Sequence, residues 1–588
     1  MGQTKSVVHD LPGSTVPLDP SHSQRGRVDL FPVALDDIKE GYIEYIFTLR
    51  ELLMMQLMVA ITDKPDWETK IHNKEITDKW RAEMAQSGQD VSPAMMDYMF
   101  EELKWKSTES QKTGFVRAYD PGVVRSDTAI SEEIRHALQA AVKPLEDVPE
   151  EEKDYHPRSN NQVVDLVHPS LFPFVYGRTK VLRNTLIGID DCFSSVGQGE
   201  IVKVANRGQS HNPESARRAV THPNPSSEKF QWLPCNVQLN ADGECKITSY
   251  INNLHPAKHR DLYGIVEHVL TRAVPLWSAS LTQYCRPHRI PYRDVEYPSD
   301  EEPQPEELEG ESDDEYDERY RAWKAQRNVK QPEPGSFEPP RVYWLGEVDL
   351  VKQFEESGLQ VIVKLANIEL TPEKPDYGGG SWHIEGQLNE RICATALYYY
   401  DNENITPSTL AFRHRGDSEY IERMNYGQEE FEFMRVFGFD PDDGHQEVDC
   451  PITQNLGDIT CKQGRLLTFP NTLQHRVSSF SLADKTKPGH RKILALFLID
   501  PHRKIISTAN VPPQREDWCN EWKEAVHDAL GERLPFELQD MVQQNSELNP
   551  MTMGEAKALR LELMDERSKK EVEFNKDFEH GGFSLCEH

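Results

Sequence analysis

Apolar residues recur at helical spacing early in the chain and at strand spacing later. From about Asp36 to Ile61, and again from about Glu75 to Lys106, a spacing of three to four residues predicts helices. After residue 340 the chain consists of short runs rich in β-branched and aromatic residues, such as LQVIVKLANIEL, RICATALYYY, GRLLTFPN and KILALFLID. Many short strands without alternating helices predict a sandwich, jelly roll or barrel.

These patterns predict an α+β protein whose jelly-roll core is braced by helices from both ends of the chain. One segment breaks the pattern, because its acidic runs with Pro, Ser and Gly bury too little apolar surface to offset the entropy of ordering. The predicted parts are an irregular arm (1–30), a helical region (31–150), a mixed α/β region that can complete the core (151–297), an acidic disordered insertion with one short helix (298–340), the β core (341–512) and a C-terminal helical region (513–588).

Charge and composition narrow the possible partners. The 588 residues include 66 Lys and Arg against 98 Asp and Glu, a formal charge of −32, which argues against binding of duplex nucleic acid. The apolar run IFTLRELLMMQLMVAI is short and carries charged residues, so it predicts a buried helix and no transmembrane segment. The start MGQTKS fits the pattern for myristoylation of Gly2, which alone gives only weak, reversible membrane attachment.

The cysteines indicate the compartment. Nine cysteines are scattered along the chain without a CxxC pair, which does not suggest a disulfide framework. We therefore expect an intracellular protein of the cytoplasm or nucleus.

The stretch SWHIEGQLNE carries the first candidate chemistry. If it is a strand, His383 and Glu385 lie on the same face, where they can share one metal ion. A non-haem Fe(II) site uses two histidines and one carboxylate and leaves three positions open. His475 opens a strand after the turn PNT in GRLLTFPNTLQHRV and can supply the third ligand. An HxE pair alone is a weak signal, and the alternative is that His383 and Glu385 pair with each other or with Arg391 on an exposed face.

A cation on a neighbouring strand would extend this site. An iron oxygenase that uses 2-oxoglutarate needs a cation for the distal carboxylate, and Arg491 stands at the start of KILALFLID. Arg413 is a competing cation on the strand TLAF. Tyr398 shares a strand face with Ala394 and Ala396, where it either donates a hydrogen bond to the cosubstrate or packs in the core.

Other sites are less favoured. The sequence has no GxxxxGK[ST], GxGxxG or GxSxG motif, and no cluster of Cys and His for structural zinc. The remaining histidines of the β-rich part lie in polar surroundings and are predicted to be exposed: His414, His445, His490 and His502.

The segments WHIEG, GRLLTFPNTLQHRV and RKILALFLIDP resemble the HxD/E, distal His and downstream Arg motifs of the Fe(II)/2-oxoglutarate-dependent oxygenases, whose fold is a double-stranded β-helix. From its N-terminal helices through SYINNLHP to FSLCEH, the chain more closely resembles a fungal family recorded as a domain of unknown function. The first resemblance implies that His383, Glu385 and His475 bind Fe(II) and that Arg491 anchors 2-oxoglutarate. It also implies a dioxygenase that oxidises a C–H bond of an unidentified protein or metabolite, with Glu385 where Asp is commoner.

Two alternatives remain open. One is a non-catalytic β-scaffold whose helices and acidic insertion recruit partners. The other is a cupin-type metal protein with hydrolytic or isomerase chemistry. Metal content and turnover of 2-oxoglutarate distinguish these alternatives from the oxygenase.

Overall fold

The computed structural model describes residues 30–35, 45–183, 185–202, 225–285, 289–298, 303–342, 346–416, 424–425, 432–439, 447–521 and 550–584. The predicted N-terminal arm with Gly2, the loop residue His445 and much of the predicted C-terminal helical region lie outside these described residues. The chain combines helices with a large antiparallel sheet, in agreement with the predicted α+β class.

The main sheet has nine antiparallel strands. Its central strands are long, buried and rich in β-branched residues, which is the composition that fits a sheet covered on both faces. The order is β1 (Val116–Tyr119), β2 (Val123–Ser126), β18 (Leu466–Pro470), β14 (Ile392–Glu403), β21 (Gly489–Ile499), β12 (Leu359–Leu370), β8 (Cys235–Leu239) and β9 (Cys245–Ile247), with β3 (Val163–Val167) also paired to β12.

A smaller sheet packs against the inner face of the main sheet. It contains β17 (Thr453–Thr460), β15 (Thr409–Arg415) and β19 (Gln474–Val477), in that order. Apolar side chains of both sheets fill the space between them, including Phe412 from β15 and Phe469 and Phe497 from the main sheet. This inner core surrounds the candidate site.

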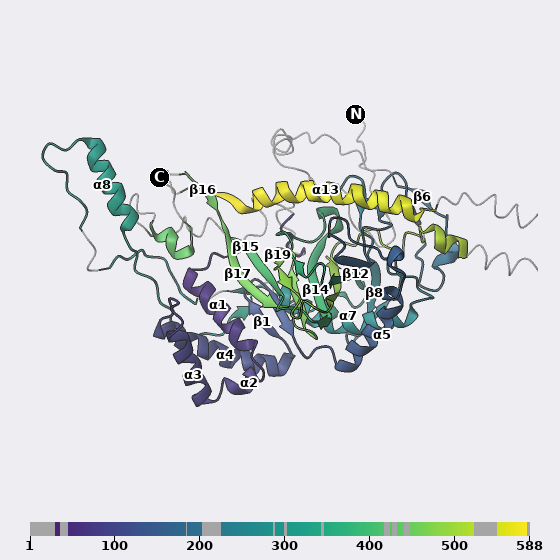
Figure 1. Cartoon of the computed structure of the whole chain (residues 1–588), viewed down its shortest axis with the longest axis horizontal. Coiled ribbons are helices and arrows are strands. Elements are labelled where there is room, and N and C mark those ends of the chain that lie inside the picture. Colours follow the sequence, from purple (N-terminus) through teal and green to yellow (C-terminus); the bar gives the residue numbers. More distant parts are fainter. Residues whose placement is uncertain are drawn as a thin grey trace, which may run out of the picture.

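Helices cover the outer face of the main sheet and one end of the molecule (Figure 1). Helices α5 (Glu132–Glu146) and α7 (Arg260–Leu281) bury their apolar faces against the outer face of the main sheet. The N-terminal helices are α1 (Leu49–Thr62), α2 (Trp67–Lys70), α3 (Lys74–Ala85) and α4 (Pro93–Thr113). Local sequence sets their starts, because Thr48 and Glu51 form a capping box at α1, while Ser92 caps α4 with Pro93 in its first turn.

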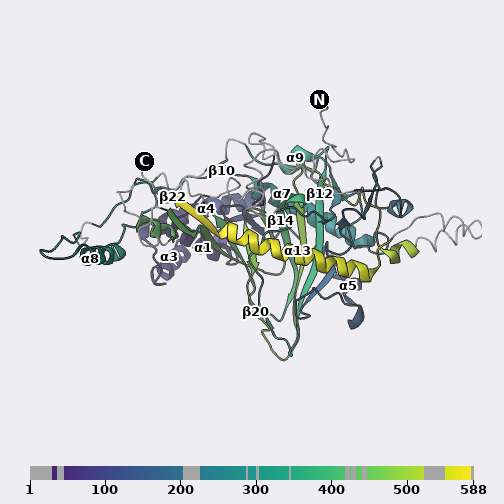
Figure 2. The same ribbon diagram turned by 90° about the horizontal axis from the view of Figure 1, so that it is seen from above.

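A long C-terminal helix, α13 (Met553–Glu579), crosses the strands of the core in both views (Figures 1 and 2). Helix α8 (Asp313–Gln326), within the predicted acidic insertion, projects away from the body (Figures 1 and 2). No described helix is long and apolar enough to cross a membrane.

The remaining elements among the described residues are short. They are α9 (Leu350–Phe354), the paired strands β4 (Phe174–Val175) with β7 (Phe230–Gln231), β5 (Lys180–Val181) with β6 (Glu200–Ile201), β10 (Tyr284–Cys285) with β11 (Arg341–Val342), β13 (Asp376–Tyr377) with β20 (Phe480–Ser481), and β16 (Glu447–Pro451) with β22 (His580–Ser584). Within the described part of the chain, four 3₁₀ turns span Glu150–Glu152, Cys192–Ser195, Leu388–Glu390 and Glu432–Phe437.

Candidate metal centre

The two histidines of the predicted site are direct neighbours. His383 and His475 form an antiparallel bridge, with N–H to O distances of 3.1 Å from His383 to His475 and 3.0 Å in the reverse direction. Directly paired residues of antiparallel segments point to the same side. Their ring centroids are accordingly 4.4 Å apart.

Glu385 completes a compact group. Its Oε1 lies 3.8 Å from His383 Nε2 and 3.5 Å from His475 Nε2. The predicted strand is reduced to one bridge at His383, after which the chain bends, yet the carboxylate still reaches the side of the histidines. Gly386 continues this bend with a φ of +73°, where a Cβ would lie 2.7 Å from Ile392 Cδ1. One ligand atom from each of the three residues lies within 4.8 Å of the others.

Asn471 of the FPN turn holds Glu385 in place. Its Oδ1 accepts the N–H of Glu385 at 2.9 Å, and its Nδ2 donates to the carbonyls of Glu385 and Ile392, both at 2.9 Å. Its own N–H donates to Cys393 O at 2.8 Å. This role was not predicted from the sequence. The only signal was a polar residue in the turn before His475, because its partners are distant in the sequence.

Replacing Asn471 with alanine should lower the free energy of unfolding by about 2 kcal/mol, because buried N–H and C=O groups lose their partners. It should also weaken metal binding, since Glu385 loses its backbone anchor. Asn471→Asp retains the acceptor for Glu385 and should be milder in metal affinity. Chemical unfolding and metal titration check this, and equal metal affinity in the alanine variant and the wild type would contradict the positioning role.

The hydrogen bonds of His383 fix which ring nitrogen can bind a metal. His383 Nδ1 lies 2.9 Å from the carbonyl oxygen of Ser381. A carbonyl only accepts, so Nδ1 carries the proton and Nε2 keeps its lone pair. That lone pair belongs to the nitrogen nearest Glu385, which is the arrangement typical of a metal-binding histidine.

The protonation states of Glu385 and His475 favour metal binding. Burial raises the pKa of the Glu385 carboxyl, but the imidazoles of His475 and His383 outweigh it and lower the pKa to about 2. Burial, together with His383, lowers the pKa of His475. Glu385 is therefore ionised and His475 neutral near neutral pH, as ligation requires.

The ionisation of Glu385 should be visible in the pH dependence of the unfolding free energy of the metal-free protein. Because the folded pKa of Glu385, about 2, lies below the ordinary 4.5, its stabilisation is fully present above pH 4.5 and is lost as the pH falls toward 2. The difference in unfolding free energy between the wild type and Glu385→Gln should shrink by about 1 kcal/mol from pH 7 to pH 3.5. Chemical unfolding at both pH values measures it, and a constant difference would contradict the assigned pKa.

Arg491 lies on the inner face of β21. It is 2% exposed, its Nη1 donates to Ser408 Oγ at 2.6 Å, and the rings of Tyr399 and Phe480 lie 5.7 and 5.2 Å from its guanidinium carbon. Its Nε has no hydrogen-bond partner, and no carboxylate of the described residues forms an ion pair with it. Asp500, an acid just beyond the end of the same strand, does not pair with Arg491 and accepts from Phe31 and His502. A buried guanidinium without a counter-ion is costly, so the position suits an anionic ligand.

The two other candidates for contact with the cosubstrate, Tyr398 and Arg413, do not face the inner core. Tyr398 is buried with Ala394 and Ala396 in the outer core under α7, so its neighbour Tyr399 is the tyrosine near Arg491. The side chain of Arg413 faces away from the inner core and hydrogen-bonds Gln474 and Glu579.

The prediction that His414 is exposed is wrong. The strand TLAFRHR continues to Arg415, and His414 on it is fully buried, with Nε2 3.2 Å from Gln454 Oε1. His490 and His502 are partly exposed and pair with Asp401 and Asp500.

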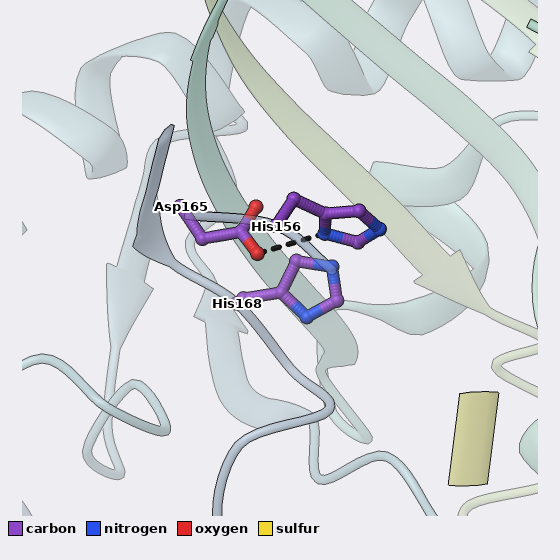
Figure 3. A group of neighbouring side chains, drawn as sticks. All are labelled: His156, Asp165 and His168. Carbon is purple, nitrogen blue, oxygen red and sulfur yellow. Dashed lines mark hydrogen bonds and ion pairs between the residues drawn. The ribbon is translucent and has the colours of Figure 1, made fainter. Parts of the chain in front are cut away.

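A second group of possible ligands, which the sequence did not suggest, surrounds β3 (Figure 3). His156 Nδ1 lies 2.8 Å from Asp165 Oδ2, and His168 lies beside both. His168 Nδ1 accepts the N–H of Ser170 at 3.1 Å, and burial lowers the pKa of His168 well below its ordinary value. The neutral ring therefore carries its proton on Nε2 and offers no free lone pair. Since Arg560 also lies 3.6 Å from Asp165, a hydrogen-bonded polar cluster explains this group better than a metal site.

Helix α13 contacts the segments that carry both histidines. Asn575 Nδ2 donates to the carbonyl of Trp382 at 2.9 Å, and Asn575 Oδ1 accepts from Gln474 Nε2 at 2.6 Å. Glu571 accepts from Ser381 Oγ at 2.8 Å. The C-terminal helix therefore covers the backbone beside the candidate centre.

A separate cavity of about 460 Å³ lies between α4, the end of α7 and the turn residues Pro470 and Thr472. It includes none of His383, Glu385 and His475. Its acids already have cationic partners, because the buried Glu102 pairs with Arg289 and Lys106, and the partly buried Asp120 also pairs with Arg289.

Comparison with known families identifies relatives. Residues 93–522, well over half of the chain, match the family described as "Protein of unknown function (DUF4246)". The chain belongs to this family. Residues 11–83 match the corresponding N-terminal domain, "Domain of unknown function DUF4246, N-terminal". The family description names neither a reaction nor an organism, so the predicted fungal origin stays a prediction. No curated protein matches the chain.

Solved structures give only remote similarities. The chain is similar to IDO from Bacillus thuringiensis (10% identity, TM-score 0.14, covering 24% of this chain and 46% of that one). It is similar to a bsmA homolog from Methylobium petroleophilum PM1 (12%, 0.15, 29% and 57%) and to the Fe(II)/(alpha)ketoglutarate-dependent dioxygenase TqaL (15%, 0.15, 30% and 52%). The matched region spans about half the length of each of these proteins. These similarities are too weak to assign a fold or a function to the chain.

Proposed function

We propose that this protein is an Fe(II)/2-oxoglutarate-dependent oxygenase. The observation that carries the proposal is the buried guanidinium of Arg491, which has no counter-ion among the described residues and lies on the same inner core as the compact group of His383, Glu385 and His475. The compact group alone is compatible with a polar cluster, and a buried arginine alone with a structural role. Together they offer a place for a metal and a place for the distal carboxylate of a cosubstrate.

The strand order supports a double-stranded β-helix as the fold of this core. In one sheet the order β12, β21, β14, β18 is antiparallel, and in the other the bridge residue His383 adds to β19, β15 and β17. Along the chain, successive strands change sheet except at the step from β15 to β17. Such alternation winds the chain around one core and places the ends of several strands at a common mouth.

The residues fit a divalent metal. Two atoms that each lie about 2.1 Å from one ion are about 3 to 4 Å apart. Glu385 Oε1 meets this condition, at 3.8 Å from His383 Nε2 and 3.5 Å from His475 Nε2. Two histidines and one carboxylate are the donor set of non-haem Fe(II) oxygenases, which leaves positions for cosubstrate and oxygen.

Bound Fe(II) with 2-oxoglutarate and O₂ would supply the oxidation of an unreactive C–H bond. The protein's own residues would bind and orient the reactants. Arg491 would hold the distal carboxylate with its paired N–H donors, while the rings of Tyr399 and Phe480 keep water from it. Ser381 orients His383, and Asn471 orients Glu385. The substrate would be a protein side chain or a metabolite.

The direct test is turnover of 2-oxoglutarate by the full chain. The oxygenase should consume it and release succinate only with Fe(II) and O₂, and His383→Ala should do neither. Metal binding without consumption of 2-oxoglutarate would favour the cupin-type alternative. Absence of both would favour the non-catalytic scaffold.

A further inference from the structure

Lys364 is an unusual residue within the central strand β12. The strand alternates between the outer core, which holds Val363 and Leu365, and the inner core, which holds Ile362. Side chains two apart on a strand share a face, so Lys364 points to the inner side with Ile362. It is directly opposite Ala495 of β21, another residue of the inner core.

The ammonium group of Lys364 has no partner among the described residues. It makes no hydrogen bond or ion pair with any of them, although the side chain is half-buried between strands that are largely buried. Half-buried lysines normally pair with an acid or carry their charge out to solvent. Because Lys364 points to the inner side and pairs with no acid, its ammonium group is available to an anionic ligand.

The acids near Lys364 are already engaged. Its positive charge helps to lower the pKa of Glu385 and that of Asp165, so it lies within the electrostatic reach of both carboxylates. Glu385 faces His383 and His475. Asp165 is bound by His156 (Figure 3), and Arg560 also lies 3.6 Å from it. Neither acid lies within ion-pair distance of the ammonium.

Lys364 and Arg491 occupy different levels of the inner face. Arg491 is opposite Ile368 of β12 and Lys364 is opposite Ala495, so the two positions are four residues, or about 13 Å, apart along the strand. Phe497, two residues beyond Ala495, is level with Phe469, whose ring lies 4.7 Å from that of His475. Lys364 therefore lies between the level of Arg491 and the level of the candidate metal centre.

We propose that Lys364 is a second carboxylate-binding residue of this site, which rests on the proposed function. The carboxylate belongs either to 2-oxoglutarate, as its end nearest the metal, or to an acidic substrate. Both sources present the same chemistry to the ammonium group, and binding measurements separate them.

The test uses the full chain with the charge removed or kept. Lys364→Met removes the charge, Lys364→Arg keeps it, and Lys352→Met, at an exposed position of α9, is the matched control for loss of a lysine. Calorimetry under anaerobic conditions gives the affinity of the Fe(II)-loaded protein for 2-oxoglutarate. A loss of tenfold or more in Lys364→Met, but not in the other two variants, assigns the carboxylate to the cosubstrate.

A second arm tests an acidic substrate. With 2-oxoglutarate saturating, acetate serves as the carboxylate probe, detected through broadening of its proton signal by Mn(II) in place of Fe(II). If Lys364→Met binds 2-oxoglutarate with unchanged affinity but binds acetate at least fivefold more weakly, the carboxylate belongs to the substrate. If Lys364→Met changes neither affinity, the proposal is overturned.

Failure of the proposed function has a different signature. If the wild type binds neither metal nor 2-oxoglutarate, the oxygenase proposal fails. Acetate binding to the metal-free wild type, measured by calorimetry and lost in Lys364→Met, would then still support a carboxylate site at Lys364. Binding that is equal in both proteins would overturn that site as well.

Discussion

Replacing His475 with alanine is expected to weaken Fe(II) binding by at least about 100-fold, since even the loss of outer hydrogen-bond partners of a ligand costs 10- to 100-fold. His475 is 4% exposed, and its Nε2 is one of two imidazole nitrogens that face the Glu385 carboxylate. Removing it leaves only two donors on one side of the ion. Anaerobic titration with Fe(II), or with Co(II) as a spectroscopic substitute, measures the affinity.

The matched control is His136→Ala. The side chain of His136 is 64% exposed and lies on α5, remote from the group. It should leave metal affinity unchanged. If His475→Ala folds normally and retains full metal affinity, the three residues are a polar cluster and the metal centre is wrong.

Replacing Arg491 with methionine should weaken binding of 2-oxoglutarate by about 100-fold or more while metal affinity stays within a few-fold of the wild type. Two hydrogen bonds to a charged carboxylate contribute about 1.5–3 kcal/mol each, and each 1.4 kcal/mol is about a factor of ten. Methionine keeps much of the packing against Tyr399 and Phe480. Calorimetry on the metal-loaded protein gives both affinities.

Arg341→Met is the control for loss of a surface arginine, because the Arg341 side chain is 83% exposed. It should bind 2-oxoglutarate like the wild type. Equal binding by Arg491→Met would contradict the assigned anchor. Loss of metal together with 2-oxoglutarate would show that Arg491 acts on the structure of the centre and does not bind the cosubstrate directly.

The compact group of candidate metal ligands could be predicted because its residues follow a local sequence pattern. The two-residue spacing of His383 and Glu385 and the strand opened by His475 are visible in the sequence, and the structure brings these three residues together. Arg491 was visible as the cation that begins a buried strand. The structure shows that this cation has no counter-ion among the described residues. The sequence could not show this, because an acid such as Asp500 could have formed a salt bridge with Arg491.

The errors arose where a local sequence pattern does not determine which face of a strand points inward or where a strand ends. Alternation correctly grouped Tyr398 with Ala394 and Ala396, but it cannot say which face is the inner one, and Tyr399 lies on the inner side. His414 was assigned to a polar loop because charged residues surround it. Pairing with β17 and β19 keeps that segment in the sheet and buries the histidine.

Contacts between residues distant in the chain could not be predicted from the sequence. Asn471 and Asn575 position the candidate centre through partners that are far away in the chain. Lys364 was overlooked because one lysine in an apolar run is usually an outward-facing residue. Its inward position follows only from the register of β12 with its neighbours.

The most direct measurement is the visible absorption of the anaerobic protein with one equivalent of Fe(II) and excess 2-oxoglutarate. If both ligands share this centre, a charge-transfer band should appear at one metal per chain. The band should be absent in His475→Ala and require much higher 2-oxoglutarate concentrations in Arg491→Met. A wild-type protein that shows no band, or a band that persists unchanged in both variants, would contradict the account.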